Sequence, residues 1–339
     1  MNKYKPAKYL LINLLIVFTV SSCDRDESFS EFPDTPTNLI EFNTGFDDYN
    51  STAPSFGETF PFCFSSNRNS LGGQFDVIYK LMTIEFDKDT RELEIFNNTN
   101  GNLSVVIENM TLISGLNQIN TTSNEFGPYL IPRGLVESPS SANNRYEGYI
   151  LMYSDDSEGN QNIMFTHNLD DESFASPVEV AFLNSAFDDA YPTFNMDNSQ
   201  LFFSSNREGT HNIYSQETDS EKNIIDILTS TNSEVKREDV LSTAFDELCP
   251  FVIENLLVFA SNRDGGFGGY DLYYSKWENG EWTAPINFGE KINSEFDEFR
   301  PIVRKELEFN NDIMIFSSNK PEGMGGIDLY YVGIEQLNE

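Results

Sequence analysis

The chain of 339 residues contains only two histidines, His167 and His211, and neither lies in a zinc-binding or catalytic-triad motif. It also lacks a glycine loop that follows a strand and opens a helix, so Gly265 to Gly269 is not interpreted as a phosphate-binding loop. These absences argue against a histidine-rich zinc enzyme, a triad hydrolase and a nucleotide-binding protein.

Basic side chains are scarce as well. The chain has 21 Lys and Arg residues against 55 Asp and Glu residues, which gives a formal net charge of −34. Such a charge argues against nucleic acid and anionic lipid head groups as partners, because both are polyanions. It favours a cationic protein surface or divalent cations.

The chain has only three cysteines, Cys23, Cys63 and Cys249. An oxidising compartment would invite a disulfide between the last two. Their places in the repeats described below argue against it, because Cys63 belongs to a second strand of the first unit and Cys249 precedes Pro250 in the fourth. We expect two separate free thiols, with Cys63 buried as a small hydrophobic residue.

Long apolar runs are missing except at the amino terminus, where Tyr9 to Val20 follows Lys3, Lys5 and Lys8. Val20-Ser21-Ser22-Cys23 resembles the lipobox of bacterial lipoproteins, which implies a signal peptide over residues 1–22 and a lipid anchor on Cys23. Residues 23–36 are polar and acidic and predict a flexible tether. The remaining residues, 37–339, form the expected folded domain.

The acidic residues that follow Cys23 bear on where the anchored protein would lie. Asp24, Asp26 and Glu27 resemble the export signal of surface lipoproteins in Bacteroidota, although a solvated linker explains the same charges. We expect a protein that is lipid-anchored in the outer membrane, with the cell surface slightly favoured over the periplasmic face.

Five repeats account for the rest of the chain. A Phe-acid-acid-x-x-Pro segment recurs before a Ser-Asn-Arg strand end and an Asx-apolar-Tyr strand. The acid segments begin at Phe46, Asn124, Phe187, Phe245 and Phe296, and the strand ends at Ser66, Ser154, Ser205, Ser261 and Ser318, where Ser154-Asp155-Asp156 is the divergent member. Short strands with Gly and Asx turns at this regularity predict a β-propeller.

The two ends of the repeat array predict how the ring closes. The last unit stops after Asp328 to Val332 and lacks a final strand, whereas Thr37 to Thr44 looks like a strand without a unit. A ring closed by its own amino-terminal strand has no open sheet edge. We therefore expect an all-β, five-bladed β-propeller closed by the amino-terminal strand and preceded by a lipoprotein signal peptide and a short tether.

The units resemble the WD40-like β-propeller repeat of the TolB type found in envelope lipoproteins of Bacteroidota. The residues that carry the resemblance are Ser261 to Ser275, SNRDGGFGGYDLYYS, and Ile292 to Pro301, INSEFDEFRP. It covers residues 37 to 332. Because propellers of this type mostly bind or scaffold, the resemblance implies the fold more strongly than any activity.

Acidic residues at the start of each first strand are the main candidate site, since first strands line the channel of a propeller. The expected ring is Asp47, Asp48, Glu125, Asp188, Asp189, Asp246, Glu247, Asp297 and Glu298. Three interpretations are open. The acids can brace turns through Arg68, Arg207, Arg263 and Lys320, bind a cation or a basic partner, or catalyse glycoside cleavage.

Repetition favours bracing, because a catalytic acid and base need different environments, whereas these acids have the same neighbours in nearly every unit. We therefore expect no catalytic residue and no cofactor, with a divalent cation such as calcium in the acidic ring as the exception. The expected function is a non-enzymatic docking or scaffold module in an outer-membrane complex for protein assembly, secretion or nutrient uptake. The alternative is a glycan-binding or glycoside-cleaving propeller.

Overall fold

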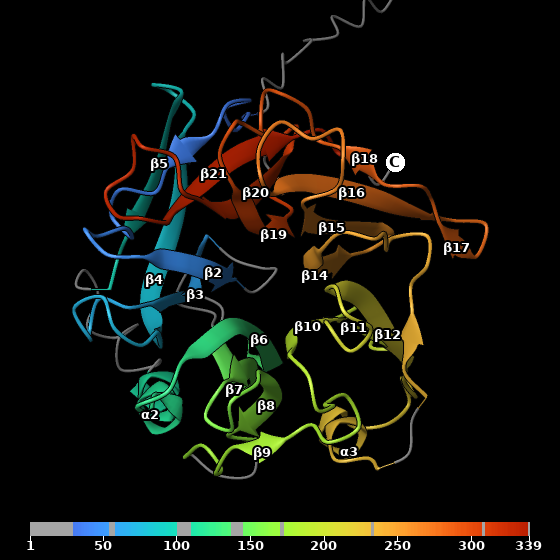
Figure 1. Ribbon diagram of the computed structural model, residues 1–339. Helices are drawn as coiled ribbons and strands as arrows, with labels where there is room; N and C mark the ends of the chain where they lie inside the picture. Colours follow the sequence, from blue (N-terminus) through green and yellow to red (C-terminus); the bar gives the residue numbers. More distant parts are fainter. Residues whose placement is uncertain are drawn as a thin grey trace, which may run out of the picture.

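The computed structural model describes residues 30–53, 58–99, 110–136, 145–169, 173–231, 234–306 and 309–337. Five small antiparallel sheets are arranged in a ring around one axis, so the protein is a five-bladed β-propeller, as the repeats predict (Figure 1). The innermost strand of each blade contacts the innermost strands of the two neighbouring blades, which closes the circle.

The blades follow one another along the chain. Blade 1 has β2 (Asp48–Thr52), β3 (Thr59–Ser66), β4 (Asp76–Asp87) and β5 (Glu92–Asn97), and blade 2 has β6 (Glu125–Val136), β7 (Arg145–Asp155), β8 (Asn162–His167) and β9 (Val178–Glu179). Blade 3 has β10 (Asp189–Phe194), β11 (Gln200–Ser205), β12 (Asn212–Glu217) and β13 (Lys236–Arg237). Blade 4 has β14 (Glu247–Ile253), β15 (Leu256–Ser261), β16 (Asp271–Glu278), β17 (Glu281–Trp282) and β18 (Ile286–Asn287).

Blade 5 combines the two ends of the chain. It has β19 (Glu298–Arg304), β20 (Asp312–Ser318) and β21 (Asp328–Ile334), and its outer strand is β1 (Thr37–Asn38) from the amino terminus. Thr37 pairs with Tyr331 and Asn38 with Tyr330, which confirms the expected closure. The closing strand is shorter than Thr37 to Thr44 because the Phe42 amide donates back to the Leu39 carbonyl in a turn.

Residues before the closing strand are also packed. Phe32 is buried and stacks on Phe309, with ring centroids 4.0 Å apart, and the Phe32 amide donates to the Asn311 side chain at 2.9 Å. The Gly333 amide donates to the Pro33 carbonyl at 2.7 Å. The part of the expected tether that the structure describes therefore lies against blade 5, and the packed chain begins before residue 37.

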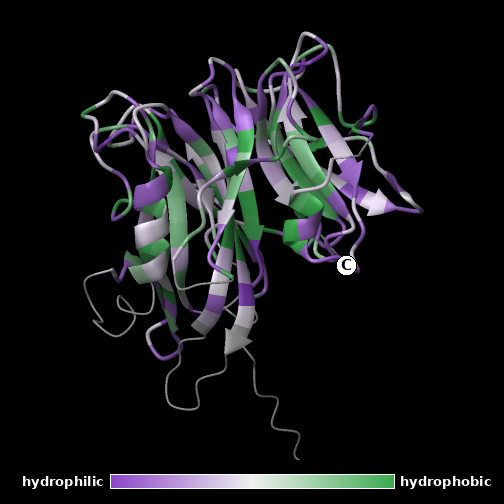
Figure 2. Cartoon of the chain, turned by 90° about the horizontal axis from the view of Figure 1, so that it is seen from below, coloured by the Kyte–Doolittle hydropathy of each residue, from purple (hydrophilic) through white to green (hydrophobic). Residues whose placement is uncertain are grey.

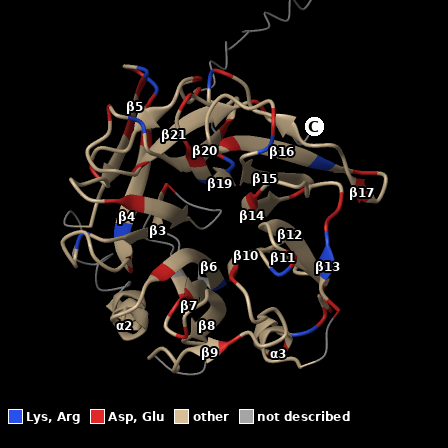
Figure 3. Cartoon of the chain, in the orientation of Figure 1, with Lys and Arg blue, Asp and Glu red and all other residues tan. Residues whose placement is uncertain are grey.

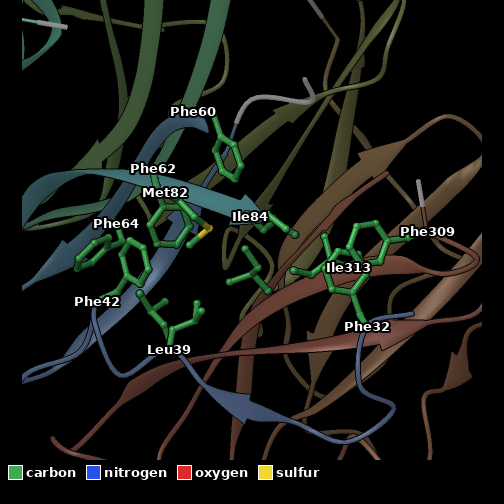
Figure 4. Close-up of a cluster of buried hydrophobic side chains, with 13 residues drawn as sticks. Phe32, Leu39, Phe42, Phe60, Phe62, Phe64, Met82, Ile84, Phe309 and Ile313 are labelled. Atoms are coloured by element: carbon green, nitrogen blue, oxygen red, sulfur yellow. The ribbon is translucent and has the colours of Figure 1, made fainter. Parts of the chain in front are cut away.

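The core lies between blades, because each blade is covered on both faces by its neighbours. In β3, Phe60, Phe62 and Phe64 alternate onto one face and join a cluster shared with blade 5 (Figure 4). Cys63 points to the other face and packs toward blade 2. Apolar residues consequently fill the strands while polar residues dominate the loops (Figure 2). Burying each such phenylalanine stabilises the fold by about 2–3 kcal/mol.

Two helices occur between the strands of the described residues. Helix α2 (Met110–Ile119) packs Leu112, Leu116 and Ile119 against blades 1 and 2, and α3 (Ile224–Leu228) is a short turn of helix beside blade 3. Neither helix is long and apolar enough to cross a membrane, and the same holds for every helix in the described ranges. Cys63 and Cys249 are buried free thiols, as expected, and burial raises the pKa of both to about 12.

Every innermost strand carries a β-bulge at the same place, three residues into the strand. The bulge residues have positive φ: Asn50 (58°), Gly127 (54°), Tyr191 (58°), Cys249 (58°) and Arg300 (47°). Three bulge amides donate to serine hydroxyls of the preceding blade, Asn50 to Ser317, Tyr191 to Ser154 and Cys249 to Ser204. The bulges thus connect the blades around the axis.

Candidate functional site

The second acid of each repeat begins an innermost strand and has no exposed surface. These residues are Asp48, Glu125, Asp189, Glu247 and Glu298. Each accepts hydrogen bonds from the amide and the hydroxyl of a Ser or Thr four residues earlier; the Ser185 amide, for example, donates to Asp189 at 2.6 Å. The carboxyl therefore braces the turn that leads into the strand.

Four of these five acids also meet a cation from the Ser-Asn-Arg strand end. Arg207 lies 2.6 Å from Asp189, Arg263 lies 3.1 Å from Glu247, and Lys320 lies 3.4 Å from Glu298. Arg68 pairs with Asp48 in the same way. The guanidinium of Arg207 further donates to the Leu183 carbonyl at 2.6 Å and lies over the rings of Phe203 and Tyr214. Charge, hydrogen bonds and ring contacts hold each cation in place.

The first acid of each repeat connects neighbouring blades. Asp47, Asp188, Asp246 and Asp297 each accept from the asparagine side chain of their own blade. They also accept from a backbone amide of the preceding blade: Ile327, Gln161, His211 and Tyr270, at 2.9–3.0 Å. The acids of the expected ring therefore brace turns and join neighbouring blades. Acidic residues, red in Figure 3, lie at strand ends around the molecule. The described residues contain no cluster of three or more potential metal ligands.

Blade 2 keeps the inter-blade contacts with the two residue types exchanged. Its first position is Asn124, whose side-chain oxygen accepts from the Phe75 amide at 2.9 Å. The partner is Asp156, which accepts from the Asn124 amide at 2.9 Å and from its side chain at 2.6 Å. The asparagine and the acid have changed places, and the same three hydrogen bonds are made.

The second acid of blade 2, Glu125, is in a different environment from its counterparts. Its cross-strand partner is Asp155, where the four other blades have a serine. The next-but-one residue is the exposed Ser157, where the other blades have Arg or Lys. Two directly opposed residues lie on the same face of a sheet, so two carboxyl groups are neighbours here, and no ion pair of either is found within the described ranges.

Burial shifts the pKa of Glu125, as it also raises the pKa of Glu298 in blade 5, where the charge of Lys320 opposes the rise. Burial raises the pKa of Glu125 to about 7, the hydrogen bonds from Thr121 oppose this rise, and the charges of Asp155 and Asp76 add to it. The Oε2 atom has no hydrogen-bond partner. Asp155 is partly exposed and accepts from the amide and hydroxyl of Ser157. Blade 2 therefore holds two neighbouring carboxyl groups in unlike surroundings.

The sequence contains a signal for the Glu125–Asp155 pair, but the alignment expected from the repeats differs from the strand register by one residue. Ser154-Asp155-Asp156 was matched to Ser-Asn-Arg, whereas the strand register aligns Asp155-Asp156-Ser157 with Ser66-Asn67-Arg68. Ser154 resembles the serine of the Ser-Asn-Arg strand ends, but it lies one residue before the position that pairs with the acid. In the correct register, the loss of the arginine is evident from sequence.

Exposed aromatic rings lie at the same end of the blades as the acids. Phe187 and Phe245 directly precede acid pairs, and Phe267 lies in a strand-connecting loop that reaches the Phe296 turn. All three are between 37% and 49% exposed. Trp282 is packed against Phe202, whereas Trp277 is half exposed at the far end of β16. The three exposed rings therefore lie at the acid end of blades 3 and 4.

Comparison with known proteins gives the same architecture. No family model matches the chain, and no curated protein matches it in sequence. Among solved structures, a thermostable family-43 glycoside hydrolase has a TM-score of 0.52 and 12% identity, over 89% of this chain and 94% of that one. The catalytic domain of a GH62 α-L-arabinofuranosidase from Coprinopsis cinerea has a TM-score of 0.48 and 9% identity, over 90% of this chain and 97% of that one. At such identities the likeness shows the fold.

This comparison contradicts two expectations from the sequence, a non-enzymatic docking module and the absence of an enzyme. The family-43 structure that shares this fold is a glycoside hydrolase, so the fold does not imply a non-enzymatic docking module. The expectation rested on the acids that have the same neighbours in nearly every unit and gave no weight to the unit that differs. Blade 2 departs from the repeated pattern at the position where catalysis would require a unique residue.

Proposed function

We propose that this chain is a glycoside-cleaving five-bladed propeller whose active site lies at the acid end of blade 2. The observation that carries the proposal is the Glu125–Asp155 pair, in which one carboxyl is buried with a pKa of about 7 and the other is partly exposed. Glycosidases commonly use two carboxyl groups, one protonated to assist the leaving group and one ionised. The fold shared with a family-43 glycoside hydrolase supports the same reading.

Glu125 is assigned the role of general acid. With a pKa of about 7 it retains its proton through mildly acidic conditions, and its Oε2 atom has no competing partner in the protein. Asp155 is assigned the role of the second carboxyl group. Glu125 has no exposed surface, so the substrate must displace the exposed turn at Thr121 and Thr122 or the exposed turn at Ser157 to reach it.

Activity measurements on matched variants test this assignment. The purified protein is assayed against a panel of aryl glycosides and plant and bacterial polysaccharides. Glu125→Gln and Asp155→Asn are expected to lose at least about 100-fold in kcat/KM while remaining folded. Glu298→Gln, the same position in blade 5, serves as the control and is expected to retain activity. Loss of activity in all three variants in proportion to their loss of stability would contradict the proposal.

We also propose that the chain belongs to the TolB-type WD40-like repeat lipoproteins and is held at the outer membrane by a lipid on Cys23. The repeat signatures at Ser261 to Ser275 and Ile292 to Pro301 support the first point. Lys3, Lys5 and Lys8 before an apolar run that ends at Cys23 support the second, although these residues lie outside the described ranges. Incorporation of labelled palmitate into the native protein but not into Cys23→Ser is the expected result. Equal incorporation into both would contradict the anchor.

A further inference from the structure

Arg300 crosses the axis of the propeller. It is the bulge residue of β19 in blade 5, yet its Nη2 atom lies 3.3 Å from the Pro128 carbonyl in blade 2. Its guanidinium also lies 5.6 Å from the centre of the Tyr191 ring in blade 3. Neither blade adjoins blade 5 in the ring. The side chain must therefore enter the channel that the five innermost strands enclose.

The positive charge of Arg300 is uncompensated within the described residues. The side chain has no exposed surface, and it forms none of the ion pairs found among the described residues. The titratable groups that act on it are Cys249, Tyr191 and Tyr129. Burial raises the pKa of all three, which keeps them neutral near pH 7. No carboxylate among them balances the guanidinium.

Burial lowers the pKa of Arg300, but a guanidinium starts from so high a pKa that it keeps its proton in proteins. A buried lysine or carboxyl group, in contrast, can become neutral. An uncompensated buried charge is strongly destabilising. Two of its donor atoms, Nε and Nη1, have no hydrogen-bond partner, although buried donors almost always have one. Charge and hydrogen bonding therefore both require a partner that the chain itself does not supply.

A second unpartnered donor occupies the matching bulge position in blade 1. Asn50 is 1% exposed, and its Nδ2 atom has no partner with hydrogen-bond geometry among the described residues, although its side chain lies close enough to Tyr191 to lower the pKa of that hydroxyl. The channel is narrow at this level: a side chain at Gly127 would place its Cβ 2.5 Å from the Tyr191 ring. The available partner must be small, negatively charged and an acceptor of several hydrogen bonds.

We propose that the axial channel contains a binding site for a small monovalent anion of the size of chloride, held by Nε and Nη1 of Arg300, with Nδ2 of Asn50 as a further donor. Water would satisfy the donors and leave the charge unbalanced, whereas a chloride-sized anion satisfies both. The site would stabilise the ring at its centre by linking blade 5 to blades 1, 2 and 3. It is independent of the proposed glycoside cleavage at Glu125.

Anion-dependent thermal unfolding tests the site. The midpoint is measured for the purified full chain in sodium chloride, sodium bromide and sodium gluconate at matched ionic strength, gluconate being too bulky for the channel. We expect a saturable rise of about 2–4 °C in chloride and bromide over gluconate. Arg300→Met should remove this difference, and Lys291→Met, which changes an exposed cation, should retain it. Identical midpoints in the three salts for the unmodified protein would overturn the proposal.

A crystallographic measurement keeps the test decisive if Arg300→Met does not fold. Crystals of the unmodified protein grown in bromide should show an anomalous peak on the propeller axis within hydrogen-bonding distance of Nε and Nη1 of Arg300. Water density there without an anomalous signal would show a solvated guanidinium and would refute the anion site.

Discussion

Blades 2 and 3 have the same backbone plan and different chemistry at the same position. In blade 3, Asp189 is enclosed by Ser185 and paired with Arg207 at 2.6 Å. In blade 2, Glu125 keeps the equivalent turn contact with Thr121 but faces Asp155 and no cation. The same position thus holds a paired carboxylate in blade 3 and a buried carboxyl with a raised pKa in blade 2, while both keep the turn contact that braces the strand.

The largest effect is expected from breaking the brace of the regular blade. Arg207→Met would leave the fully buried Asp189 charge without its cation, and the protein should lose about 3 kcal/mol of its free energy of unfolding. Denaturant titration measures this loss. Ser157→Met at the matching place in blade 2 breaks no ion pair and is the control, expected within about 0.5 kcal/mol of the unmodified protein. Equal losses in the two variants would mean that the blades do not differ as described.

The next effect is the pH dependence that Glu125 contributes, alongside blade 5, where burial also raises the pKa of Glu298, Asp312 and Asp328. The pKa of Glu125 rises from its ordinary 4.5 to about 7, so the folded state holds the proton more tightly than the unfolded chain. The resulting stability is fully present below pH 4.5 and is lost as the pH rises through 7, by up to about 3 kcal/mol. Glu125→Gln should flatten this part of the stability profile. An unchanged profile in Glu125→Gln would place the titration elsewhere.

Blade 2 can also be converted to the regular pattern. Asp155→Ser combined with Ser157→Arg supplies the serine and the cation that blade 3 has, and should lower the pKa of Glu125 by about 1 to 3 pH units. Carbon-detected NMR titration of the labelled carboxyl measures the change, and the proposed glycosidase activity should disappear with it. A pKa that stays near 7 would show that burial alone, without the missing cation, sets its value.

The smallest effect concerns the exchanged pair that joins blades 1 and 2. Asn124→Asp or Asp156→Asn alone should cost about 1–2 kcal/mol, because each leaves two like groups facing one another. The double variant restores the asparagine–acid pair in the orientation of the other blades and should regain most of that loss. A double-mutant cycle on the free energy of unfolding measures the coupling. If the two losses in the free energy of unfolding simply add in the double variant, Asn124 and Asp156 are not coupled as a pair.

Much of this fold could be predicted because repeats multiply a weak signal. The acid, Asn and Arg positions recur often enough to give the number of blades, and the unmatched Thr37 strand gives the closure. Local pattern did not predict α2, because its Leu112, Leu116 and Ile119 are buried by contacts with strands distant in sequence. The Glu125–Asp155 pair was not predicted for a related reason. The register of β6 against β7 is set in the folded hairpin, and the alignment expected from sequence differs from it by one residue. That difference hid the replacement of the repeated arginine by Ser157.

The route of the chain into the ring has a mechanical consequence. Force applied on the amino-terminal side of residue 30 first reaches the Ser30–Phe309 bridge, the Phe32–Phe309 stack and the hydrogen bonds of Phe32 and Pro33 with blade 5. The two residue pairs of β1 with β21 are loaded only after these contacts have broken. Tension there would therefore strip the closing strand from blade 5 and expose β21 as an open sheet edge, while β19 keeps its contacts with β14 and β2.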